Sequence, residues 1–160
     1  MRTSIIVALA ALAAALLATS ALAAPQKTIP ISGTLAGTAS TKVDGNTATI
    51  AATGTGKLAS LGAGKIVGNG TAPDTTKQPC TPFGGTGTIT AGGSVIAFTV
   101  PQSSSGCGDE GGHTFSIKGV FQVTKVTGKL AKAKGSIRFS GVYDRDGGTF
   151  SVKLTGTLKK

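Results

Sequence analysis

Apolar residues alternate with polar or small residues in short runs, and this period of two recurs along most of the chain. Such a period is the signature of β-strands that bury one face and expose the other. Runs of this kind lie at residues 28–38, 46–54, 64–72, 84–93, 94–102, 113–123, 134–143 and 148–158. Gly is abundant and costly inside helices, whereas Thr and Val favour strands. We therefore predict an all-β domain.

Turn signals separate the predicted strands. Tight hairpin turns are expected at Asp44-Gly45-Asn46, Gly92-Gly93 and Asp146-Gly147-Gly148. The fifth strand should end where Pro101 removes a ladder donor. Short strands joined by hairpins favour an eight-stranded antiparallel β-barrel, with a β-sandwich as the alternative. The near copies ISGTL (31–35) and LTGTL (154–158) favour the barrel, since first and last strands then share similar surroundings.

The pentapeptide TGKLA occurs twice, at Thr55–Ala59 and at Thr127–Ala131. Each copy consists of a Thr-Gly turn, a Lys-Leu pair and a small residue, and a Gly-led strand follows after a short spacer. Glycine supplies the backbone angles that a sharp corner needs. We interpret the repeat as a strand–turn–strand corner in which Leu58 or Leu130 plugs the end of the barrel.

The second copy extends to Thr127–Gly135, with the sequence TGKLAKAKG. It resembles the corner GTGRF-x-G-A-x-G of many secreted bacterial proteins and of the plant allene oxide cyclase and dirigent proteins. It departs from that pattern in Lys129 and Leu130, which replace Arg and Phe, and in Val126, which replaces the leading Gly. The resemblance implies an eight-stranded antiparallel barrel that acts on or holds an apolar molecule. None of the family's catalytic residues has a matching position here.

The N-terminus predicts a secretory signal peptide. Arg2 supplies the positive charge, Ile5–Leu17 form an apolar segment, and Ala21-Leu22-Ala23 gives a small-x-small cleavage pattern. We expect cleavage after Ala23 or Ala24, leaving one domain at residues 24–160 that is exported to the periplasm or the exterior. We expect no transmembrane span in the mature chain, because seven aromatic residues and a Lys-bearing outer face do not supply an outer-membrane barrel's girdles.

The two cysteines, Cys80 and Cys107, lie in loop-like stretches of a chain predicted to reach an oxidising compartment. We predict a disulfide between them. Their spacing is not CxxC and two thiolates make a poor zinc site, so neither redox catalysis nor metal binding is expected.

Positive charge is concentrated in the C-terminal part. Residues 118–160 hold ten basic and two acidic residues. Outward-facing strand positions and the corner are predicted to form one basic patch, which comprises Lys118, Lys125, Lys129, Lys132, Lys134, Arg138 and Lys153. It either keeps the protein soluble or binds an anionic polymer or envelope surface. Sequence-specific nucleic-acid binding is not expected. Tyr143 is the one tyrosine and is expected to be able to face outward, but a single aromatic ring does not supply a platform for stacking bases.

Asp109, Glu110 and His113 form a cluster predicted at the rim of the barrel. Two carboxylates and an imidazole can bind a metal or move protons, but they are equally typical of a solvated loop. The segment 144–148 has the Asp-x-Asp-Gly of calcium loops without the rest of the motif. We predict no metal and no cofactor.

These features favour a secreted, non-catalytic binding or structural barrel that holds a small hydrophobic ligand. The inward-facing positions carry no carboxylate, His or Lys, which argues against catalysis inside the barrel. The alternatives are an isomerase or cyclase acting at the barrel mouth, and adhesion to an anionic polymer through the basic face. Whether the interior is open or filled, and whether the protein forms oligomers, is left open by the sequence.

Overall fold

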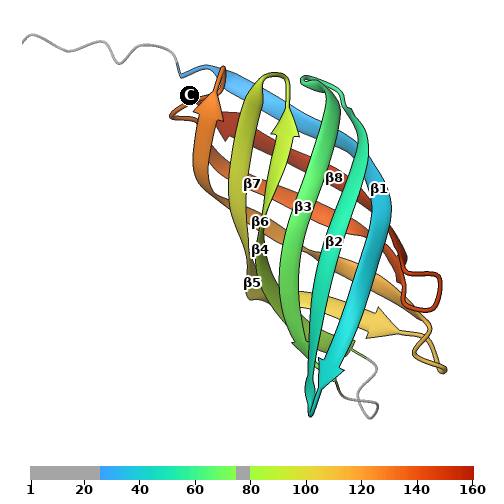
Figure 1. Ribbon diagram of the computed structural model, residues 1–160. Helices are drawn as coiled ribbons and strands as arrows, with labels where there is room; N and C mark the ends of the chain where they lie inside the picture. Colours follow the sequence, from blue (N-terminus) through green and yellow to red (C-terminus); the bar gives the residue numbers. More distant parts are fainter. Residues whose placement is uncertain (1–25, 75–79) are drawn as a thin grey trace, which may run out of the picture.

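Eight antiparallel strands follow one another around a closed barrel in the computed structural model of the protein (Figure 1), which describes residues 26–74 and 80–160. The strands are β1 (Thr28–Asp44), β2 (Thr47–Leu58), β3 (Gly62–Pro73), β4 (Cys80–Ala91), β5 (Ser94–Gly108), β6 (Thr114–Gly128), β7 (Lys134–Asp144) and β8 (Thr149–Lys159). β1 pairs with both β2 and β8, so the sheet closes on itself. The predicted eight-stranded barrel is confirmed and the sandwich is not. The predicted signal peptide lies outside the described residues.

β5 does not end at Pro101, as the sequence suggested, but continues to Gly108. The residues Pro101–Ser103 have no register partner in β4 or in β6. The missing N–H of Pro101 therefore breaks no ladder bond, and the strand resumes its pairing beyond this irregular stretch.

The order of the strands places successive turns at opposite ends of the barrel, so that alternate turns share an end. The turns β2–β3, β4–β5 and β6–β7 lie at one end together with the C-terminus, and we call this the closed end (Figure 1). The turns β1–β2 and β7–β8 and the connections β3–β4 and β5–β6 lie at the other end, which we call the open end.

Aliphatic side chains fill the interior toward the closed end. Those whose exposure is below 2% are Ile31, Leu35, Leu58, Ile89, Ile96, Ile137, Leu154 and Leu158. All but Leu58 belong to the alternating runs read from the sequence, and Leu58 belongs to the repeated corner. Their burial removes large apolar areas from water. This aliphatic plug seals one half of the barrel and supplies the main core.

The two copies of TGKLA are not equivalent. Both copies close the turn with the same kind of bond, from the Leu61 N–H to the Leu58 carbonyl at 3.1 Å and from the Ala133 N–H to the Leu130 carbonyl at 3.0 Å. In the first copy, Leu58 is fully buried. In the second copy, Leu130 is only half-buried and its N–H donates to Ser94 Oγ, 3.0 Å away. The prediction of a plugging leucine is therefore confirmed for Leu58, whereas Leu130 lies at the edge of the core.

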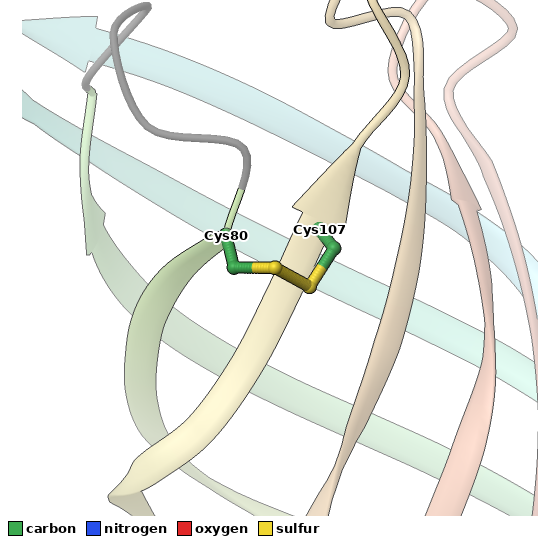
Figure 2. Close-up of a disulfide and its surroundings, with 2 residues drawn as sticks. All are labelled: Cys80 and Cys107. Carbon is green, nitrogen blue, oxygen red and sulfur yellow. A yellow bond between two sulfur atoms is a disulfide. The ribbon is translucent and has the colours of Figure 1, made fainter.

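The predicted disulfide is confirmed. Cys80 and Cys107 are cross-strand partners at the open-end limits of β4 and β5 (Figure 2). The bond therefore ties together two strands where the aliphatic plug does not reach.

Candidate functional site

The open half of the barrel contains a cavity of about 580 Å³. All seven aromatic residues of the chain line it, namely Phe83, Phe98, Phe115, Phe121, Phe139, Tyr143 and Phe150. Three of the rings form a continuous stack, with centroids 4.1 Å apart for Phe98–Phe121 and 4.5 Å apart for Phe121–Phe139. The aromatic side chains therefore form one wall of the cavity, contributed mainly by β5–β8.

The facing wall consists of small residues from β1–β3. They are Ala39, Ala48, Ala52, Gly68, Gly70 and Ala72. The alternation of these strands aims them inward, where Ile50 and Ile66 are the larger side chains of the same wall. The cavity exists because small residues face large ones without filling the space between them.

One hydroxyl pair interrupts the apolar lining. Thr41 Oγ1 and Tyr143 Oη lie 2.5 Å apart and share a hydrogen bond. Tyr143 is 8% exposed, and its ring packs against Phe115 with centroids 6.1 Å apart. The expectation that Tyr143 faces outward is wrong: it occupies the same parity on β7 as Phe139, so the pleat turns it into the barrel. The sequence reading therefore missed an inward-facing hydroxyl.

An ion pair crosses the mouth of the cavity. Arg145 Nη2, in the turn after β7, lies 3.5 Å from Asp74 Oδ1, directly after β3. β3 and β7 are opposite each other in the ring of eight strands, and both side chains line the cavity. The backbone N–H of Arg145 also donates a hydrogen bond to the backbone carbonyl of His113, with a distance of 2.8 Å. This pair narrows the entrance and was not predicted.

The rim cluster is divided between structural contacts. Asp109 accepts the His113 N–H at 2.8 Å and the Thr114 N–H at 3.1 Å, and the bond from the His113 backbone is the main cause that lowers the pKa of its carboxyl. The His113 ring turns away to Asp146, with Nδ1 2.6 Å from Oδ2. Asp109 and Glu110 line the mouth of the cavity, whereas His113 does not. Within residues 26–74 and 80–160, no group of three His, Cys, Asp or Glu side chains is arranged to hold a metal ion.

The basic residues occupy two separate regions. Lys118, Arg138 and Lys153 lie together in a hollow on the outer face of β6–β8. The other residues predicted for the patch are exposed toward the closed end, and they are Lys125, Lys129, Lys132 and Lys134. Lys27, Lys57, Lys159 and Lys160 also lie there. Both groups were predicted to form one patch, because the sequence alone does not show how far apart they lie along the strands.

Acidic residues lie at the opposite end. All six of the chain belong to the open end: Asp44, Asp74, Asp109, Glu110, Asp144 and Asp146. The barrel is thus basic at its closed end and acidic around its mouth. This separation could be read from the sequence. Alternate turns of an up-and-down barrel share an end, and the acidic residues lie in or directly beside the first, third, fifth and seventh connections.

Among the residues that the structure describes, no helix is long and apolar enough to span a membrane. No family model matches the chain, and no significant match exists among curated proteins or solved structures. The resemblance of Thr127–Gly135 to the allene oxide cyclase and dirigent corner stays a prediction.

Proposed function

We propose that the protein is an exported, non-catalytic binding protein that holds a small hydrophobic ligand in the open half of its barrel. The observation that carries this proposal is that every aromatic residue of the chain lines one cavity of about 580 Å³. This volume lies within the roughly 300–1,000 Å³ of small-molecule sites.

The lining defines the chemistry of the ligand. Aromatic and alanine side chains favour an apolar body, and the Thr41–Tyr143 hydroxyl pair provides a hydrogen-bonding point inside the cavity. A ligand with a single hydroxyl or carbonyl group can replace or share that bond. The six carboxylates at the open end disfavour an anionic head group at the mouth.

A cavity-filling variant with a matched control tests the proposal. Ala52 lines the cavity, whereas its neighbour Ala51 is exposed on the outer face of the same strand. We expect Ala52→Phe to weaken binding of the neutral fluorescent probe N-phenyl-1-naphthylamine at least tenfold, and Ala51→Phe to leave it unchanged. Equal probe binding by both variants would refute a ligand site in the cavity.

The second candidate is an isomerase or cyclase acting at the barrel mouth. Tyr143 is the inward-facing group that favours it, since a phenol can donate a proton or stabilise an oxyanion. Against it, the Asp109 carboxylate accepts the backbone amides of its own loop and the His113 ring is paired with Asp146, so both groups already have partners. If a bound molecule is identified, turnover of that molecule by the protein, abolished in Tyr143→Phe, would favour the enzyme.

A further inference from the structure

The outer face carries a second hollow, which shares one lining residue, Phe139, with the cavity in the barrel. It has a volume of about 490 Å³ and extends across β5–β8. Three cationic side chains line it, Lys118 on β6, Arg138 on β7 and Lys153 on β8. No carboxylate belongs to its lining.

The strand register explains why these cations meet. Lys118 pairs with Ser140, and Ser140 pairs with Lys153, so the two lysines flank β7 in one row. Arg138 is the next outward residue on β7, opposite Thr155. Adjacent strands lie about 4.8 Å apart, so the two lysine backbones are only about 10 Å apart, with Arg138 between them. Three like charges at this spacing repel one another unless an anion lies among them.

Hydroxyl groups complete the lining of the hollow. Ser105 is the register partner of Lys118, Ser140 lies between Lys118 and Lys153, and Thr155 is the register partner of Arg138. A site that combines a guanidinium, two ammonium groups and short hydroxyls offers hydrogen bonds in several directions to an oxyanion.

The sheet is open beside the hollow. Pairing between β5 and β6 stops after Thr99–Gln122 and resumes at Ser105–Lys118, so five residues of β5 face three of β6 without register partners. Ser104, in this gap, is 1% exposed, and its hydroxyl has no hydrogen-bond partner. It lies against Gly119, which lines the hollow and has no room for a side chain. The gap in β5–β6 pairing and the unpaired Ser104 hydroxyl both lower the stability of the fold, and they lie next to three clustered positive charges. A requirement for stability alone therefore does not explain this arrangement.

We propose that this hollow binds a phosphate group, a tetrahedral oxyanion carried by a larger molecule. Arg138 offers paired N–H donors, Lys118 and Lys153 approach from either side, and the hydroxyls donate the remaining bonds. The site is independent of the ligand in the barrel, and it differs from the predicted basic patch because it excludes the lysines of the closed end.

Titration of the mature protein with inorganic phosphate and with sulfate, followed by amide chemical shifts, tests the site. We expect shifts centred on Lys118–Val120, Arg138 and Lys153. Arg138→Gln should weaken binding at least tenfold. Lys125→Gln removes the same charge from β6 outside the hollow and should change affinity less than twofold. The side chains of Arg138 and Lys125 are both exposed, so both variants should fold. Equal weakening by Arg138→Gln and Lys125→Gln, or shifts centred on the closed end, would overturn the proposal.

The source of the group is decided by a second pair of probes. Polyphosphate chains represent a polymer, and vesicles containing phosphatidylglycerol represent a lipid headgroup. Binding of either probe that is lost in Arg138→Gln and kept in Lys125→Gln supports the site and identifies its source. Binding that survives Arg138→Gln, or failure to bind either probe, contradicts it.

Discussion

The two halves of this barrel differ in the side chains that line their interior and in the charges at their ends. The closed half is filled with Ile and Leu, carries lysines on its outer edge and has no acidic residue. The open half is lined with aromatic rings on one side and small residues on the other, encloses about 580 Å³, and carries all six acidic residues. One strand order supports both halves, because each strand contributes its one end to the plug and its other end to the cavity.

This contrast indicates a division of labour. Interiors that only need to be stable are closely packed, and the side chains of the plug are all less than 2% exposed. The open half contains a cavity in place of such packing. There the Cys80–Cys107 disulfide and the Asp74–Arg145 ion pair link parts of the chain instead. Stability should therefore depend mainly on the plug, and ligand binding on the cavity.

The largest effect is expected in the plug. Leu58 is fully buried, so Leu58→Ala should lower the free energy of unfolding by about 4 kcal/mol, from lost burial and an unfilled void. Ile50 lines the cavity and already faces open space, so Ile50→Ala should cost less than about 2 kcal/mol. Urea unfolding measures both. Similar losses for the two variants would contradict the division between the halves.

The disulfide should have the next largest effect, and a localised one. Its 27-residue separation predicts a loss of about 3.5 kcal/mol when both cysteines become serine, from the entropy of the unfolded chain. In native-state hydrogen exchange, amides of β4 and β5 near Cys80 and Cys107 should lose protection first. Loss of amide protection mainly around Leu58 and Leu158 would contradict this prediction, because it would show that the disulfide stabilises the closed half.

A smaller effect is expected inside the cavity. Tyr143→Phe should cost about 1 kcal/mol, because it removes a hydrogen bond and leaves the Thr41 hydroxyl without its partner. Adding Thr41→Val removes the orphaned group, so the double variant should be more stable than the sum of the single losses predicts. Strict additivity would mean that the two hydroxyls do not act as a pair.

The smallest effect is a pH response at the mouth. The pKa of Asp109 is lowered in the folded protein, chiefly by the bond from the His113 N–H, so its contribution is present above the ordinary Asp value of 3.8 and is lost as the pH falls below it. Exchange protection of the His113 and Thr114 amides should decrease over that acidic range. It should be low and independent of pH in Asp109→Asn. An Asp44→Asn control should keep the wild-type response.

The period-two pattern was sufficient to predict the barrel, its antiparallel order and most inward positions, since pleating alone decides which face a residue occupies. The disulfide followed from composition, and Leu58 from the repeated corner. Tyr143 was misplaced although Phe139, four residues earlier, already marked the inward face of that strand. The continuation of β5 past Pro101 could not be predicted, because it depends on which side of the strand lacks a partner.

The cavity could not be derived from the sequence either. Its presence depends on how far Phe98 and Phe121 reach toward Ala48 and Ala52, which is a matter of three-dimensional volume and not of pattern. The hollow at Lys118 and Arg138 likewise depends on register across four strands. The separation of charge between the ends was readable from alternate turns once the barrel was assumed.

Native mass spectrometry of the protein, purified gently from its own host, tests the central claim most directly. The claim predicts a reproducible additional mass that is released on denaturation, present in wild type and in Ala51→Phe and missing in Ala52→Phe. Identical ligand-free masses for all three proteins would contradict it and would leave the open half of the barrel without a ligand.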